Sequence, residues 1–83
     1  MIVCHLVEHE KTSYMALREF VDSHFNQISH VFADGRREVV LDDGTKHYFM
    51  GMDKYLDWCK GRTYMLDGKM YHSGYPCKKE VEE

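Results

Sequence analysis

Three Asp-Gly dipeptides, at 34–35, 43–44 and 67–68, restrict the fold of this chain more than any other feature of its sequence. Each lies between two short segments in which apolar and polar residues alternate. Asp-Gly in this setting favours a tight hairpin turn, because a type I′ turn requires positive φ at both central residues. The sequence therefore predicts antiparallel hairpins, with strands at 28–33, 36–41, 45–50, 62–66 and 69–73.

One segment has instead the period of an amphipathic helix. Its apolar stripe consists of Leu17, Phe20, Val21, His24, Phe25 and Ile28. This spacing predicts a long helix over about 14–27, with the hydroxyl of Thr12 or Ser13 as its N-cap. A shorter stripe from Met52 to Cys59 predicts a second helix over about 52–60, which Gly61 is placed to end.

These elements predict the order β-α-β-β-β-α-β-β, with Ile2–Val7 as the first strand. The expected fold is a small single α+β domain over residues 1–79, followed by an acidic tail at 80–83. A mostly antiparallel sheet would pack on the long helix. An exposed edge of such a sheet can pair with a second copy, so the sequence also allows a homodimer.

The composition is that of a soluble domain, with 43% hydrophobic and 30% charged residues. No apolar run approaches the roughly 20 residues that a membrane span needs, and residues 1–7 are too short and polar for a signal peptide. Cys4, Cys59 and Cys77 form no CxxC pair, and their odd number is a poor basis for disulfides. We therefore expect free thiols and a cytoplasmic location, without membrane contact.

The sequence contains no residue pattern that fits a catalytic or metal-binding site. His5-Leu6-Val7-Glu8-His9 matches H-x-x-E-H, which needs both histidines on one helical face to share a zinc ion. In the predicted strand, residues four apart are separated by about 13 Å, too far for one ion. Phosphate-binding glycine motifs and the G-x-S-x-G elbow are not found in the sequence. The sequence thus predicts no metal, no cofactor and no catalytic residue, and a protein that is not an enzyme.

The C-terminal region carries the strongest indication of binding. Residues 54–79 contain six Lys or Arg against two Asp, in a chain of net charge −3. A two-residue turn at 67–68 would pair Tyr64 with Tyr71 and Met65 with Met70. Because two methionines favour the core, the other face is expected to be exposed. The binding residues predicted on and beside that face are Arg62, Tyr64, Lys69, Tyr71, Trp58, Lys54 and Lys60.

Two functions from different classes fit these residues. The first is a non-catalytic inhibitor or adaptor that contacts and occludes another protein, since Trp, Tyr and Arg are the usual interface anchors. The alternative is a module that captures a nucleotide or single-stranded nucleic acid by stacking on aromatic rings and by contact of cations with phosphate. A small enzyme of unknown type is the third hypothesis. Protein binding and phosphate capture would differ in salt dependence.

Overall fold

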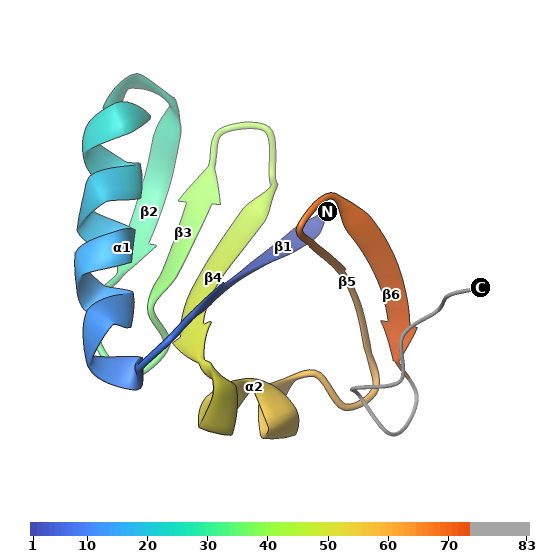
Figure 1. Ribbon diagram of the computed structural model, residues 1–83. Coiled ribbons are helices and arrows are strands. Elements are labelled where there is room, and N and C mark those ends of the chain that lie inside the picture. The colour runs from blue at the N-terminus through green and yellow to red at the C-terminus, as the bar shows by residue number, and fades with distance from the viewer. Residues whose placement is uncertain (74–83) are drawn as a thin grey trace.

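The computed structural model describes residues 1–73 and confirms the α+β class, with two helices and one mixed sheet of six strands (Figure 1). The elements are β1 (Ile2–Val7), α1 (Glu10–Ser23), a 3₁₀ turn (Phe25–Gln27), β2 (Ile28–Phe32), β3 (Glu38–Leu41), β4 (Lys46–Gly51), α2 (Met52–Trp58), β5 (Arg62–Leu66) and β6 (Lys69–Ser73). Their order is the one predicted. The predicted acidic tail at 80–83 and Cys77 lie outside the described residues.

The strands are arranged in the order β2-β3-β4-β1-β5-β6. The pairs β2–β3, β3–β4 and β5–β6 are antiparallel, as the hairpin signals predict. The central strand β1 is parallel to both of its neighbours, β4 and β5. Parallel neighbours require crossover connections, and the chain uses α2 to carry β4 across β1 to β5. The sheet is therefore mixed at its centre, which the expected meander did not include.

The two helices cover opposite faces of the sheet, because successive side chains of a strand point to opposite sides. In β4, Phe49 belongs to a cluster with Leu17 of α1, whereas the next residue, Met50, packs with Tyr55 of α2. The α1 cluster consists of Leu17, Val39 and Phe49. The α2 cluster consists of Cys4, Met50, Tyr55, Cys59, Tyr64 and Leu66. Neither helix of the described chain is long and apolar enough to cross a membrane.

The long helix lies about one turn earlier than predicted, at Glu10–Ser23 instead of about 14–27. Thr12 and Ser13 do not cap it, because their hydroxyls donate to the carbonyls of His9 and Glu10 inside the first turn. The Glu10 carboxylate instead accepts a hydrogen bond of 2.8 Å from the backbone N–H of Gly51, which joins α1 to the end of β4. The helix ends before the last part of the apolar stripe, so Phe25 is exposed.

The second helix also ends early, at Trp58 rather than about residue 60, and Gly61 then has a positive φ of 72°. Cys4 is a free buried thiol, as predicted, and burial followed by the charge of Asp67 raises its pKa to about 12. Cys59 is disulfide-bonded, so the prediction of free thiols is wrong for this residue. An odd cysteine count argues against a full disulfide framework, but it does not exclude a single bond.

Only one of the three Asp-Gly turns is the tight turn that was predicted. Asp67 and Gly68 have φ values of 53° and 80°, as a type I′ turn requires. The turn at Asp43-Gly44 is longer: the N–H of Gly44 donates to Leu41, and Gly44 alone is left-handed at 92°. The connection at 33–37 is longer still, and its left-handed residue is Arg37.

In the β5–β6 hairpin, the predicted register is confirmed but the predicted faces are wrong. Tyr64 pairs with Tyr71 and Met65 with Met70. However, Tyr64 is 0% exposed and Met70 is 49% exposed. The tyrosine face is the inner one because α2 packs over it, and the Tyr64 hydroxyl lies 2.5 Å from that of Tyr55. A buried phenol is stable only with such a partner.

Candidate functional site

A cleft of about 610 Å³ lies on the α2 side of the sheet, over β2, β3 and β4. We call it the sheet cleft. Its walls are the loop between β2 and β3 on one side and α2 with the start of β5 on the other. The residues that line it are His30, Phe32, Gly35, Arg36, Glu38, Val40, Lys46, Tyr48, Met50, Lys54, Trp58 and Arg62. Its volume lies within the range of about 300–1,000 Å³ that is typical of ligand sites.

Cationic side chains dominate the charge of the sheet cleft. Arg36, Lys46, Lys54 and Arg62 line it, against the single carboxylate of Glu38. Two of the cations are held on aromatic rings. The guanidinium carbon of Arg36 lies 4.1 Å from the centre of the Phe32 ring, and that of Arg62 lies 4.9 Å from the Trp58 ring. Cation–π contacts of this kind orient the guanidinium groups before any ligand is bound.

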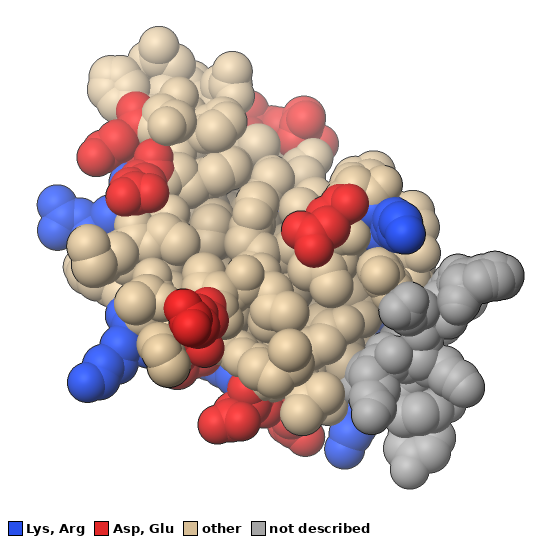
Figure 2. All heavy atoms as spheres, in the orientation of Figure 1, with Lys and Arg blue, Asp and Glu red and all other residues tan. Residues whose placement is uncertain are grey.

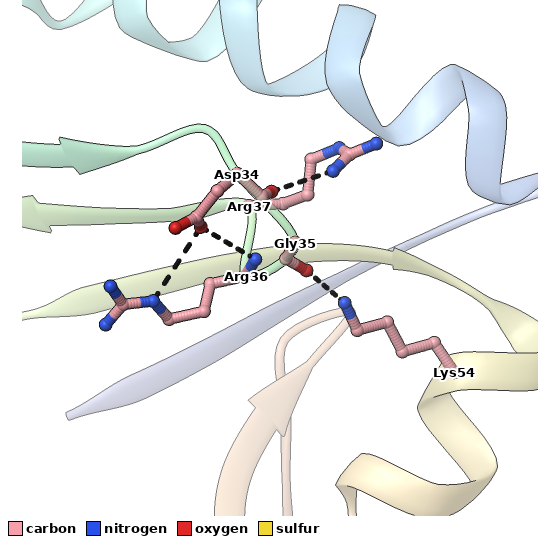
Figure 3. A network of polar contacts seen from close by, with 5 residues as sticks. All are labelled: Asp34, Gly35, Arg36, Arg37 and Lys54. Carbon is pink, nitrogen blue, oxygen red and sulfur yellow. Dashed lines mark hydrogen bonds and ion pairs between the residues drawn. The ribbon is translucent and has the colours of Figure 1, made fainter.

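The loop between β2 and β3 forms one lip of the sheet cleft (Figure 3). Asp34 shapes it, because its carboxylate accepts the N–H of Arg36 at 3.1 Å and lies 3.8 Å from the guanidinium of the same residue. Lys54 reaches from α2 to donate to the carbonyl of Gly35. Arg37 points the other way, toward Tyr14 of α1. Lys54 thus ties α2 to the lip of the cleft.

Trp58 forms the opposite wall and is half-buried. Its ring lies 5.1 Å from that of Tyr48 and 5.3 Å from that of Tyr64. Its indole Nε1 is buried and finds no hydrogen-bond acceptor among residues 1–73. An unpaired buried donor costs about 1–3 kcal/mol. The position of Trp58 is therefore set by ring packing and by Arg62, whose Nε donates to the Trp58 carbonyl.

The floor of the cleft contains a buried carboxylate. Glu38 is only 5% exposed and pairs across the β3–β4 ladder with Tyr48. Burial, then the charge of Glu38, then a side-chain hydrogen bond with Glu38 raise the pKa of Tyr48. The Tyr48 hydroxyl and the Glu38 carboxylate are thus neighbours on the floor of the cleft. One acceptor-rich group thus lies beneath four cations, and the cleft has opposite charges at its floor and its rim.

The structure brings three of the seven predicted binding residues together in the sheet cleft: Lys54, Trp58 and Arg62. Tyr64 lies beneath them in the core, so its expected exposure is wrong. The other three do not line the cleft. Tyr71 is half-buried and stacks on Tyr64 at 5.6 Å, Lys69 is exposed beside the β5–β6 turn, and Lys60 lies 3.9 Å from Asp57.

Sequence reasoning missed the other side of the cleft, formed by β2, β3 and β4. The residues concerned are His30, Phe32, Arg36, Glu38, Lys46 and Tyr48. A local signal for them exists, since Lys46, Tyr48 and Met50 alternate with His47 and Phe49. It shows that two faces differ, but not that the more polar face meets α2.

A separate histidine cluster lies on the α1 face. The Nε2 of His5 is 2.9 Å from the Nδ1 of His47, and the His5 ring stacks on Phe49 with centroids 4.4 Å apart. Burial, followed by the neighbouring His47, lowers the pKa of His5 to about 4. Burial and then His24 also lower the pKa of His47. Within residues 1–73, no group of three or more His, Cys, Asp or Glu is arranged to hold a metal ion.

Figure 2 shows one face of the molecule, on which Lys and Arg lie mainly at the margins and Asp and Glu in separate places. This face therefore carries no continuous basic surface. Comparison with known proteins assigns no relative: no family model, curated protein or solved structure matches the chain. Any functional conclusion must come from the site itself.

Proposed function

We propose that this protein is a binding module that holds an anionic, planar ligand in the sheet cleft, either a free nucleotide or one unit of a single-stranded nucleic acid. The observation that carries the proposal is the convergence of four cations and three aromatic rings on one concave surface. The rings are those of Phe32, Tyr48 and Trp58. Aromatic rings stack on bases, while Lys and Arg bind phosphate.

The arrangement of the cations supports this proposal over a plain solvated surface. Exposed lysines and arginines usually sample many conformations, and ordering them costs binding energy. Here Arg36 and Arg62 already lie on aromatic rings, and Lys54 is tied to the Gly35 carbonyl. A phosphate entering between them meets donors that are already oriented. Binding would replace the Lys54–Gly35 contact with a contact between the ammonium and a phosphate, in which both partners are charged.

The same cleft supports a second candidate, contact with another protein. Trp58 and Arg62 form a stacked pair at its wall, and Trp and Arg are the residues most enriched at the centres of protein interfaces. An acidic segment of a partner would meet the same four cations. In this case the protein acts as an inhibitor or adaptor, as the sequence suggested. Neither candidate assigns a reaction to the protein.

A charge-matched pair of double variants tests the proposal. Lys54→Ala with Arg62→Ala removes two cations from the sheet cleft, whereas Lys60→Ala with Lys69→Ala removes two from outside it. Binding of fluorescent nucleoside monophosphates and of a short mixed-sequence DNA strand is measured at low salt. The first variant should bind at least about tenfold more weakly than wild type, and the control should change little. Thermal unfolding of both variants confirms that they are folded.

Salt dependence tests the first candidate. If the cleft contacts phosphates of a single strand, log K should fall with log salt by about 0.7 for each phosphate, or about 2–3 in total. Equal loss in the two double variants would contradict the cleft as the site. If no nucleotide or strand binds at low salt, the nucleotide proposal is wrong. A partner protein that is lost only in the Lys54/Arg62 variant, and that nucleotides do not displace, would then support the second candidate.

A further inference from the structure

Glu38 is the one acidic group that lines the sheet cleft in residues 1–73. It is unexpected there because carboxylates are rarely buried. A carboxylate at 5% exposure loses most of its hydration. The ion pairs found among the described residues do not include it. Tyr48 is its neighbour across the β3–β4 ladder, and the two carboxylate oxygens offer about four lone-pair sites. Acceptor sites therefore remain on the floor of the cleft.

The charge of Glu38 also determines how an anionic ligand can lie. A carboxylate repels phosphate, so the phosphate group belongs at the rim, at the β2–β3 loop that carries Arg36 and that Lys54 contacts at Gly35 (Figure 3). The planar part of the ligand then extends over the floor, against the Tyr48 and Trp58 rings, whose centres lie 5.1 Å apart. Its edge would face the carboxylate, and only an edge with hydrogen-bond donors is compatible with it.

The nucleobases differ sharply in this respect. Guanine presents two adjacent donors, N1–H and the N2 amino group, which match the two oxygens of a carboxylate. Adenine, cytosine and uracil each place an acceptor beside their donor on the same edge, and a carboxylate repels that acceptor. A bidentate contact to the correct base is worth about 1–3 kcal/mol of discrimination, which is about fivefold to 150-fold in affinity.

We propose that Glu38 makes the sheet cleft selective for guanine. This inference rests on the proposed function, because it assumes that the ligand is a nucleotide. It goes further by assigning the base and the group that recognises it. Glu38 acts as an acceptor for the base edge, while Arg36 and Lys54 bind the phosphate.

The test compares four ligands on the wild-type protein by calorimetry at low salt: GMP, IMP, AMP and UMP. GMP should bind about tenfold more tightly than AMP and UMP. IMP keeps N1–H but lacks the amino group, so its affinity should lie between those of GMP and AMP. This comparison needs no variant, so it decides the question even if Glu38 cannot be replaced without unfolding.

Variants then assign the selectivity to Glu38. Glu38→Gln keeps the side-chain shape but turns one acceptor into a donor, and it should lower the affinity for GMP to about that for AMP. Asp42→Asn, an equal change of charge on the exposed β3–β4 loop, should leave the selectivity unchanged.

The outcomes distinguish this inference from the proposed function. Equal affinity for all four ligands, or undiminished selectivity in a folded Glu38→Gln protein, would overturn the role of Glu38 and leave nucleotide binding standing. If none of the four binds, the proposed function fails and this inference fails with it.

Discussion

The paired histidines on the α1 face predict a loss of stability in weak acid. In the unfolded chain a histidine takes up a proton near pH 6.5, whereas burial and His47 lower the pKa of His5 to about 4. Between these values the unfolded state binds more protons than the folded state. The free energy of unfolding must therefore decrease as the pH falls through this window.

The size of the effect follows from the two pKa values. A difference of one pKa unit corresponds to about 1.4 kcal/mol, so the full effect of His5 is about 3 kcal/mol before solvent screening is considered. Because His5 is only partly buried, screening reduces this effect, and the loss of stability between pH 7 and pH 5 should be about 1 kcal/mol. The lowered pKa of His47 acts in the same direction, with burial as its main cause. The other titratable groups that act on the pair are His24 at the C-terminal end of α1, which adds to these shifts, and Asp67 and Asp43, which oppose them.

Urea unfolding, followed by circular dichroism at pH 7 and pH 5, measures this loss directly. His5→Phe keeps an aromatic ring against Phe49 but cannot be protonated, so it should lose at least half of the pH dependence. His30→Phe, at an exposed position of β2, is the matched control and should retain the wild-type dependence. The reasoning is refuted if wild type is equally stable at both pH values, or if His5→Phe loses as much stability as wild type.

Three further substitutions, one of them with a matched control, test the packing through urea unfolding at pH 7. Tyr64→Ala should destabilise the protein by about 3–5 kcal/mol, because Tyr64 is 0% exposed; a loss below about 1 kcal/mol would mean that the ring is not in the core. Gly51→Ala should cost about 1–3 kcal/mol, since its new Cβ would lie 2.7 Å from the backbone nitrogen of Glu10, whereas Gly35→Ala, with no atom within 4 Å, should be nearly neutral. Gly68→Ala should cost about 1–2 kcal/mol because φ is 80° there, and an unchanged midpoint would argue against the type I′ turn.

The local parts of the fold were predictable because short-range chemistry decides them. Asp67-Gly68 determines the hairpin register through its two positive φ values, and every pair of β5–β6 agrees with the prediction. The apolar stripe of α1 is equally local, and Leu17, Phe20 and Val21 pack against the sheet as expected. The positions at which helices begin and end depend more on contacts between residues far apart in the sequence. The start of α1 is secured by a hydrogen bond between Glu10 and Gly51, 41 residues apart, which no window of sequence around Thr12 reveals.

The sheet cleft was only half predictable for a related reason. Its two sides come from β2–β4 and from α2–β5, and they face each other because β1 lies between β4 and β5. That insertion makes α2 cross over the sheet and brings Lys54 to the carbonyl of Gly35. Alternation within each strand sorts residues onto two faces, but it carries no information on which strands are neighbours. The residues near α2 were therefore found, and Arg36, Glu38 and Tyr48 were not.

In the β5–β6 hairpin the buried and exposed faces were predicted the wrong way round. This hairpin shows what decides which face is buried when both faces contain apolar residues. Met65 with Met70 and Tyr64 with Tyr71 are both acceptable core pairs by size, and methionine is the more apolar. The deciding factor is the phenol hydroxyl: Tyr64 can be buried because α2 supplies the hydroxyl of Tyr55 at 2.5 Å. Burial and this hydrogen bond raise the pKa of Tyr64, so Tyr64 stays uncharged at neutral pH. A tyrosine on a helix nine residues before a tyrosine on the following strand is thus a better indicator of the inner face here than apolarity is. The buried Tyr64 ring also packs against Trp58, with centres 5.3 Å apart, and so holds the wall of the sheet cleft in place.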